Sequence, residues 1–393
     1  MAPAAAATPI VGDPSSTIAV GEVNGDGRSD LAIVNDADGA VGIHLQRSGG
    51  GFAATADVVL KPPIQQGQPG RYALVAGDLD SDGKVDLVLT NNKTSHLVIF
   101  LGAGDGSFAA PRVFPTLPLP AATAVGDFNN DGKPDLAVVS QGSNKVGILR
   151  GAGDGTFTPG GEFAAGQEPS SIILGDFGTD SEEAARDGKV DIAVIATREG
   201  AVVILFGNGK GGVTDTGKYP SAGSTAAVAA DFNSDGLLDL ATVKPSERAI
   251  GILLGRKKGP DGSFTAEMMP TKFGGSIRPT GLAVADLDGD THLDLAVAGA
   301  AVGRSGVFVL LSRPRPNLGI VFFDPPSLCA LDSAPSALAG GDFAGKGRPI
   351  DVAVAQQGSN ALSLLSGDGA GGFTNCPGAG APGGGQAGVQ GAH

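Results

Sequence analysis

Short apolar runs return along the chain at a regular spacing, and each one follows an acidic loop. Seven of these runs begin with aspartate and continue mainly with Val, Ile, Leu or Ala, as in D-L-A-V-V at 135–139 and D-I-A-V-I at 191–195. Their near-continuous apolar character is typical of strands that are buried on both faces. The pattern therefore predicts seven copies of one β-rich unit.

Each unit is expected to contain three further strands beside that run. A short run of small residues precedes the loop, often with a proline seven residues before it (Pro120, Pro169, Pro279 and Pro335). A third run, such as H-L-V-I-F at 96–100, leads to a turn such as G-A-G-D-G-T-F at 151–157, and a more variable strand follows. Because Asp-Gly supplies the positive φ angles of tight hairpins, we interpret this turn as structural. The phenylalanines behind it are predicted to seal the blade edge (Phe52, Phe108, Phe157, Phe264 and Phe373).

The period of the repeat decides between fold classes. The acidic loops begin at Glu22, Asp78, Asp127, Asp176, Asp231, Asp286 and Asp342, so successive starts lie 49 to 56 residues apart. Four strands in each of seven units favour an all-β, seven-bladed β-propeller of four-stranded antiparallel blades over a solenoid, whose repeats usually have about 20–45 residues. We expect the propeller at 14–379, an N-terminal extension at 1–13 that is a candidate for closing the ring, and a Gly-rich flexible tail at 380–393.

The composition agrees with a turn-rich β protein and excludes some partners. The chain has 65 glycines, 26 prolines and 17% charged residues, while 41% hydrophobic residues suffice for a core. A net charge of −14 argues against a nucleic-acid partner, which needs a basic surface. We expect no membrane insertion, because no run approaches the roughly 20 apolar residues of a membrane span. The start of the chain does not resemble a signal peptide. Cys329 and Cys376 either form a disulfide or remain buried thiols.

The acidic loops have the spacing of calcium ligands. Counted from the first acid, side-chain oxygens fall at positions 1, 3, 5 and 9, glycine usually stands at position 6, and position 7 is expected to offer its backbone carbonyl. This arrangement matches the first nine positions of an EF-hand loop, except that the aspartate at position 9 opens a strand instead of a helix. Oxygen ligands at alternating positions suit Ca²⁺, so we predict about five or six bound Ca²⁺ ions.

Six loops provide the predicted ligands. In the order of positions 1, 3, 5, 7 and 9, they are Glu22, Asn24, Asp26, Arg28 and Asp30 in loop one; Asp78, Asp80, Asp82, Lys84 and Asp86 in loop two; Asp127, Asn129, Asp131, Lys133 and Asp135 in loop three; Asp231, Asn233, Asp235, Leu237 and Asp239 in loop five; and Asp286, Asp288, Asp290, His292 and Asp294 in loop six. Loop four supplies Asp176, Asp187, Lys189 and Asp191.

The loops differ in how completely they keep the pattern. Loops two, three and five are the strongest, loop one begins with the longer glutamate, and loop six has Thr291 where glycine is expected. Loop four carries seven extra residues, with Asp180 as an alternative ligand. Loop seven has Ala344 and Lys346 at ligand positions, so we predict no metal there and the Lys346 ammonium in place of the cation. Twenty of the 41 acidic residues occupy ligand positions of loops one to six. Six bound Ca²⁺ ions would therefore offset most of the net charge of −14.

These two motifs together resemble the FG-GAP/VCBS repeats of integrin α-subunit head domains. The resemblance rests on the D-x-D/N-x-D-G-x-x-D-L loop and on the L-x-G-x-G-D-G-S/T-F turn, and it covers about residues 14–379. It implies Ca²⁺ on one face of a propeller and a binding scaffold that is secreted or exposed at a cell surface. Direct transfer of the ligands holds for loops two, three, five and six and fails for loop seven.

The sequence favours a binding protein over an enzyme. We predict a non-enzymatic, calcium-stabilised adhesion scaffold, monomeric, with a protein or glycan ligand at a surface or matrix. A lectin ranks lower, because sugar sites generally use exposed aromatic rings and the chain has no Trp and two Tyr. An accessory propeller of a polysaccharide-active enzyme is the other alternative; the carboxylate spacing suits metal ligation better than an acid and base pair. Candidates for specificity are three irregular segments, 179–186, 256–258 and 313–316.

Overall fold

The computed structural model places most of the repeat region. It describes residues 18–35, 38–53, 55–63, 71–178, 187–255, 271–272, 277–301, 303–316, 320–343, 350–356, 361–376 and 389–390. Several predictions fall outside these residues and stay predictions. They concern the N-terminal extension at 1–13, the insertion at 179–186 with Asp180, the basic segment 256–258, Phe264, and the substituted positions 344 and 346 of loop seven.

The described chain forms seven four-stranded antiparallel sheets and one hairpin. The first three sheets contain β1 (Ile18–Gly21), β2 (Asp30–Val34), β3 (Val41–His44) and β4 (Val58–Leu60); β5 (Tyr72–Gly77), β6 (Asp86–Asn91), β7 (His96–Phe100) and β8 (Arg112–Pro115); and β9 (Pro120–Gly126), β10 (Asp135–Ser140), β11 (Lys145–Gly151) and β12 (Phe157–Ala164). The fourth and fifth contain β13 (Pro169–Gly175), β14 (Asp191–Ala196), β15 (Ala201–Gly207) and β16 (Val213–Pro220); and β17 (Ala226–Ala230), β18 (Asp239–Lys244), β19 (Ala249–Leu253) and β20 (Thr271–Lys272). The last two contain β21 (Arg278–Ala285), β22 (Asp294–Ala301), β23 (Arg304–Leu310) and β26 (Ser327–Leu331); and β27 (Pro335–Gly341), β28 (Asp351–Gln356), β29 (Ala361–Leu365) and β30 (Val389–Gln390).

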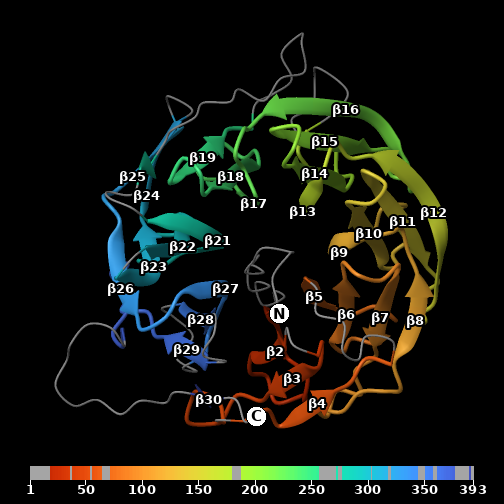
Figure 1. Ribbon diagram of the computed structural model, residues 1–393, viewed down its shortest axis with the longest axis horizontal. Helices are drawn as coiled ribbons and strands as arrows, with labels where there is room; N and C mark the ends of the chain where they lie inside the picture. Colours follow the sequence, from red (N-terminus) through yellow and green to blue (C-terminus); the bar gives the residue numbers. More distant parts are fainter. Residues whose placement is uncertain are drawn as a thin grey trace, which may run out of the picture.

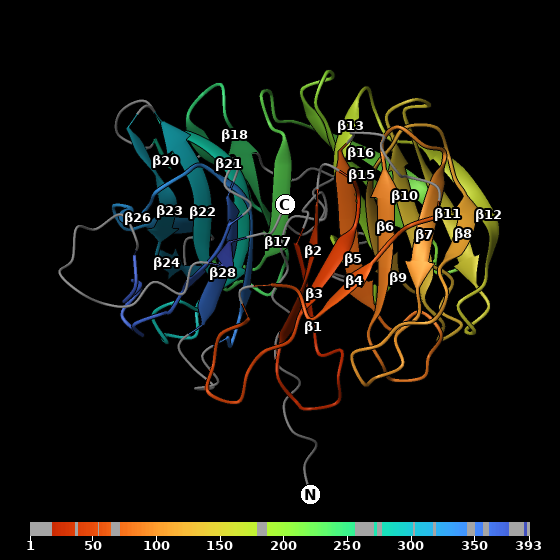
Figure 2. The ribbon, with the colours of Figure 1, turned by 60° about the horizontal axis from the view of Figure 1, so that its bottom comes forward.

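The sheets are the blades of a ring, which confirms the predicted seven-bladed propeller. The first strand of a blade lies toward the centre, and the fourth lies at the circumference (Figure 1). The strands run between the two faces of the ring (Figure 2). Blade six alone departs from this plan within the described residues, because the hairpin of β24 (Ser312–Arg315) and β25 (Ile320–Phe323) is inserted between its third and fourth strands. Val389 and Gln390, inside the segment predicted as a tail, form the outer strand of blade seven.

The recurring prolines mark a bulge at the start of four inner strands. Pro120, Pro169 and Pro335 begin β9, β13 and β27, and Pro279 is the second residue of β21. The pairing of each strand with its neighbour shifts by one residue directly beside the proline. A proline has no N–H to donate to a sheet, so it is tolerated at such an irregular end. The predicted strand starts are therefore confirmed, with a bulge that the pattern did not show.

The core is divided among the seams between neighbouring blades. Seven clusters of buried apolar residues occur, and each combines strands of two adjacent blades. At the seam between blades seven and one, Ile18 and Leu31 pack with Phe343 and Ala353. The predicted edge residue Phe52 packs against Phe343 there, with ring centroids 5.7 Å apart. Burial at every seam holds the ring together without a separate central core.

A disulfide settles the alternative that the sequence left open for the two cysteines. Cys329 in β26 and Cys376 are bonded, with their Cα atoms 5.2 Å apart. The bond links the outer strand of blade six to the segment that follows the glycine-rich turn of blade seven. These cysteines are the two in the chain, so this is its single covalent cross-link.

Candidate metal centres

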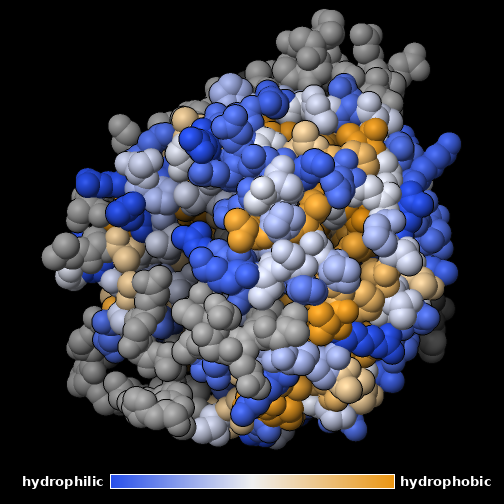
Figure 3. All heavy atoms as spheres, turned by 45° about the vertical axis from the view of Figure 1, so that its right-hand side comes forward, coloured by the Kyte–Doolittle hydropathy of each residue, from blue (hydrophilic) through white to orange (hydrophobic). Residues whose placement is uncertain are grey.

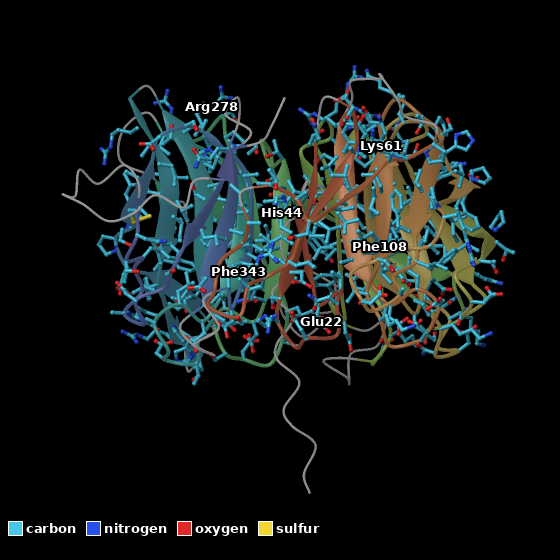
Figure 4. The ribbon with its side chains drawn as sticks, turned by 90° about the horizontal axis from the view of Figure 1, so that it is seen from below. Glu22, His44, Lys61, Phe108, Arg278 and Phe343 are labelled. Atoms are coloured by element: carbon cyan, nitrogen blue, oxygen red, sulfur yellow. A yellow bond between two sulfur atoms is a disulfide. The ribbon has the colours of Figure 1, made fainter. Side chains whose placement is uncertain are left out.

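All the acidic loops lie on the same face of the ring. Each loop joins the first strand of a blade to the second, and the first strands run in the same direction around the ring. Figure 4 shows Glu22 of loop one at one face, while Lys61 and Arg278 lie at the opposite face. The fold thus gathers the predicted ligands, as the repeat pattern implies.

The aspartate at position 9 is a structural brace in every loop. Its carboxylate is buried, with 0–2% of the residue exposed in all seven copies. In loop two, Asp86 accepts one hydrogen bond from Leu79 N and one from Gly102 N, both at 2.7 Å. Loops one and three to six repeat both bonds, through Asp30, Asp135, Asp191, Asp239 and Asp294, and Gly367 N donates to Asp351 at 3.1 Å in loop seven. The sequence pattern assigned the position 9 aspartates of loops one to six to metal alone, predicted no metal in loop seven, and missed the brace.

In blades two to five and seven, the second donor to this brace is a glycine at or shortly after the end of the third strand, whereas Gln46 and Ser312 donate in loops one and six. At Gly102 and Gly151, a Cβ atom would lie 2.2 Å from the carbonyl oxygen of Val85 and 1.9 Å from that of Pro134. Gly207 and Gly255 are equally confined. A side chain would push the strand end away and break the N–H bond to the aspartate. The constant spacing of 16 residues between aspartate and glycine was the signal that could have revealed the contact.

Burial makes these carboxyl groups weak acids. It raises the pKa of Asp86 and Asp294 to about 6 and that of Asp191 and Asp239 to about 7. Neighbouring loop acids add to the increase, and the two backbone N–H bonds oppose it. A cation in the loop would favour the charged form and reverse the shift.

The aspartate at position 1 closes the loop through the backbone. Asp78 accepts hydrogen bonds from Asp82 N at 3.1 Å and from Gly83 N at 2.9 Å. Loops three and five have the same pair of bonds to Asp127 and Asp231. In loop four, Asp187 N and Gly188 N donate to Asp176 at 3.3 and 2.8 Å, so positions 5 and 6 are recovered after the insertion.

Loop two has the clearest arrangement for a metal ion. Oxygen atoms of Asp78, Asp80 and Asp86 lie within 4.8 Å of one another. Oδ1 of Asp80 is buried and has no hydrogen-bond partner. Burial and the neighbouring Asp82 raise the pKa of Asp80. A hard divalent cation would meet the need of this oxygen, so the residues fit Ca²⁺.

Loop six gathers a second set of acids but also contacts an arginine. Oxygen atoms of Asp286, Asp288 and Asp294 lie within 4.8 Å of one another. Nη1 of Arg313, from β24, lies 3.2 Å from Asp288 Oδ2 and 3.0 Å from Asp290 Oδ2. Thr291 takes the left-handed conformation, with φ of 74°, that Gly83 takes with φ of 82° in loop two. A β-branched residue is strained in this conformation.

Loops one, three and five carry asparagine at position 3. Its side-chain oxygen accepts a hydrogen bond from the backbone N at position 5, for instance Asn129 Oδ1 from Asp131 N at 2.9 Å. The same bond occurs at Asn24 and Asn233. Within the described residues, three acidic groups converge only in loops two and six. An amide oxygen is also a calcium ligand, so the predicted sites of the other loops stay predictions.

Position 7 contributes charged side chains that the sequence reading did not use. Lys84 Nζ lies 2.9 Å from Asp82 Oδ2, and Lys189 Nζ lies 2.5 Å from Asp187 Oδ2. Arg28 pairs with Asp26 in the same way. In loop six, His292 Nδ1 lies 3.2 Å from Ser234 Oγ of loop five. In the described chain, Lys133 forms no such ion pair, and Leu237 has no charged side chain. The predicted role of the position 7 carbonyls stays a prediction.

The glycine-rich turn of the next blade contacts the acidic loop. Gly106 N of blade two donates to Val23 O of loop one at 2.9 Å, and Gly211 N of blade four donates to Phe128 O of loop three at 2.7 Å. Gly51 N donates to Phe343 O in the same way across the closing seam. The turn itself is held by its aspartate, since Asp105 Oδ1 accepts from Ser107 N at 2.9 Å. The loops are therefore part of the seams between blades.

Comparisons with known proteins agree with this architecture. The N-terminal part of BBS1 in a complex with ARL6 has a TM-score of 0.57 and 14% sequence identity, over 91% of this chain and 92% of that chain. A protein from Lactobacillus plantarum has a TM-score of 0.54 and 13% identity, over 93% and 95%. An Agrocybe aegerita lectin that recognises terminal N-acetylglucosamine has a TM-score of 0.40 and 16% identity, over 94% and 79%. At identities this low, the first two structures show the fold alone, and the lectin, with a TM-score below 0.5, adds no argument.

The sequence itself identifies the family. No curated protein matches the chain. No helix among the described residues is long and apolar enough to cross a membrane. FG-GAP-like repeats match residues 23–89, 78–138, 127–181, 185–242 and 231–297, which together span more than half of the chain. The protein therefore belongs to the FG-GAP-like repeat family.

Proposed function

We propose that this propeller is a calcium-stabilised, non-enzymatic binding scaffold that works outside the cell. The observation that carries the metal role is loop two. Three carboxylates converge there, and one of their oxygens is buried without a hydrogen-bond partner. Such a group is costly to bury and gains most from a cation. Bound calcium would supply positive charge at this point.

The residues of the loops would hold the ion and fasten neighbouring blades. In loop two, Asp78, Asp80 and Asp86 are the ligands that the geometry supports. Asp86 is also fixed to the ends of two strands by its backbone bonds. Loop one is bonded to the turn of blade two through Val23 O. Ordering a loop therefore stabilises the seam beside it, so metal binding and folding are coupled.

An extracellular location is supported by the disulfide. Bonded cysteines such as Cys329 and Cys376 persist mainly in oxidising compartments. Extracellular calcium sites also tolerate weak binding, since extracellular modules have dissociation constants of about 10⁻⁴–10⁻³ M. A loop that lacks one carboxylate would still be filled there.

The ligand is proposed to be a protein or a glycan at a surface or matrix. Most of the described carboxylates of the loops are engaged by backbone N–H groups or by Lys and Arg side chains, which supports a structural role over general acid and base catalysis. Of the histidines, His44 is buried in β3, and His292 contacts Ser234. Hydrophobic side chains form small patches among hydrophilic ones on the side shown in Figure 3. Val59 of β4 and Val113 of β8 are exposed hydrophobic residues of outer strands.

Two experiments test this proposal in sequence. Calorimetric titration of the chelated protein with Ca²⁺ should show several bound ions, and Asp80→Ala, which removes the side-chain oxygens at position 3, should remove one of them. Absence of calcium binding would refute the metal role. Capture of surface proteins on the immobilised propeller, with and without EGTA, and a glycan array in calcium buffer would then identify the ligand. Reproducible glycan binding would establish the lectin alternative, and turnover of a polysaccharide would contradict a non-enzymatic role.

A further inference from the structure

The hairpin of blade six packs against the seam between blades five and six through Val321 and Phe323, and one charged side chain, Arg313, joins it to loop six. Arg313 extends from β24 and donates to two carboxylates of loop six, Asp288 and Asp290. Its Nε also donates to Asp324 Oδ2 at 2.9 Å, directly after β25. The guanidinium therefore joins loop six to both strands of the hairpin. A planar group with five N–H donors suits this multiple contact.

Loop two balances its charge in another way. Its position 5 carboxylate, Asp82, is paired with Lys84 of the same loop, and the Lys84 side chain is 43% exposed. Movement of Lys84 would release no other element of the fold. In loop six the partner of Asp290 lies 23 residues along the chain, and the Arg313 side chain is 34% exposed. Displacing Arg313 has a structural consequence that displacing Lys84 does not have.

Arg313 and a metal ion would use the same carboxylate. Asp288 belongs to the set of three acids that can hold a cation, and its Oδ2 is also bonded to Arg313. The position 5 ligand, Asp290, is bonded to Arg313 as well. A divalent cation among these oxygens would repel a guanidinium about 3 Å from them. The two positive groups would therefore compete for these carboxylates.

We propose that Arg313 is an internal competitor for Ca²⁺ at loop six. Calcium enters this loop only when the guanidinium leaves Asp288 and Asp290, and its entry frees the β24–β25 hairpin from loop six. The proposal rests on the calcium role proposed above. It makes loop six the weaker site although it has all four carboxylates, because the binding-competent form is a minor population while Arg313 is docked.

Calcium titration of Arg313→Ala beside the unchanged protein tests the competition. Arg315→Ala is the matched control, because Arg315 lies in the same strand and its Nη1 donates to Pro314 O at 3.5 Å, away from the loop six carboxylates. Arg313→Ala should tighten one calcium site by roughly tenfold or more, and Arg315→Ala should change none. Arg313→Lys keeps the positive charge but loses the planar array of guanidinium donors. Its calcium affinity should lie between those of the unchanged protein and Arg313→Ala. Equal affinities in the unchanged protein and Arg313→Ala would overturn the proposal, provided other loops bind calcium; absence of binding in both would instead refute the calcium role.

Hydrogen exchange of the hairpin provides a readout that does not depend on counting ions. In the unchanged protein, saturating calcium should increase amide exchange in Ile320–Phe323, while β23 stays protected. In Arg313→Ala the same segment should exchange rapidly with or without calcium. Hairpin exchange that is insensitive to calcium in the unchanged protein would contradict release of the hairpin, and calcium-sensitive exchange that persists in Arg313→Ala would exclude Arg313 as its cause.

Discussion

Loops two and six have the same four carboxylates but different surroundings. Loop two has glycine at position 6 and a lysine of its own that pairs with the position 5 carboxylate. Loop six has Thr291 in a strained conformation and an arginine that comes from an inserted hairpin. If Arg313 competes with calcium as proposed, the number of acidic ligands alone does not set the metal affinity of a loop. The cationic side chains that balance these carboxylates in the absence of metal then also matter.

Removal of calcium is expected to have the largest effect, and it should act through loop two more than loop six. A site filled at 100 times its dissociation constant contributes about 2.7 kcal/mol, so several filled loops should lower Tm by about 10 °C on chelation. Differential scanning calorimetry with EGTA measures this change. Asp80→Asn should reduce the calcium-dependent increase in Tm when the calcium concentration is low. If Asp288→Asn reduced it equally, the difference between the loops would disappear.

Asp86→Asn should be the most damaging single substitution in loop two. The amide replaces one acceptor with a donor that faces a backbone N–H, and it leaves that N–H buried without a partner. We expect a loss of about 3 kcal/mol in the free energy of unfolding, even in EGTA. Asp80→Asn should be neutral or stabilising in EGTA, since Asp80 Oδ1 has no partner to lose. Urea unfolding of both variants in EGTA distinguishes the structural role of Asp86 from the metal-binding role of Asp80. Equal losses in the free energy of unfolding would show that position 9 has no special structural role.

The pH dependence should change sign between the chelated and the calcium-loaded protein. The pKa of Asp86 in loop two and of Asp294 in loop six is raised to about 6. At pH between about 4 and 6 the folded chelated protein therefore binds more protons than the unfolded chain, and the free energy of unfolding falls as pH rises through this range. Bound calcium requires the ionised form, so its stabilisation grows as pH rises. Thermal melts at pH 5 and pH 7.5 test both directions; a chelated protein that is more stable at pH 7.5 would contradict them.

Thr291→Gly should have the smallest effect and make loop six more like loop two. Relief of the left-handed conformation should stabilise the chelated protein by about 1 kcal/mol. The reciprocal change, Gly83→Thr, should cost a similar amount, because a Cβ at Gly83 meets no atom within 4 Å and only the backbone conformation matters. Chemical denaturation of both variants measures the pair. Destabilisation by Thr291→Gly would indicate that the threonine side chain supports loop six.

The sequence predicted the ring because the information for it is local and repeated. The apolar runs after each position 9 aspartate are strands, and H-L-V-I-F is β7 with the expected ends. The site was predicted less well, because its decisive contacts join distant residues. The bond from Gly102 N to Asp86 and the contact of Arg313 with Asp290 depend on how strands return to the loop. The motif identified which side-chain oxygens could bind a metal ion. It did not show which of them accept hydrogen bonds from backbone N–H groups or from Arg313.

The single cross-link between blades six and seven makes the ring mechanically uneven. Cys329–Cys376 fastens that seam covalently, whereas contacts such as Phe52 with Phe343 and Gln46 Nε2 with Asp342 O at 3.1 Å join blades seven and one. If the described chain is stretched between Ile18 in blade one and Gln390 in blade seven, the seam between these two blades has no covalent link, and we expect it to open first. We expect the seam between blades six and seven to separate last, because Cys329–Cys376 holds it.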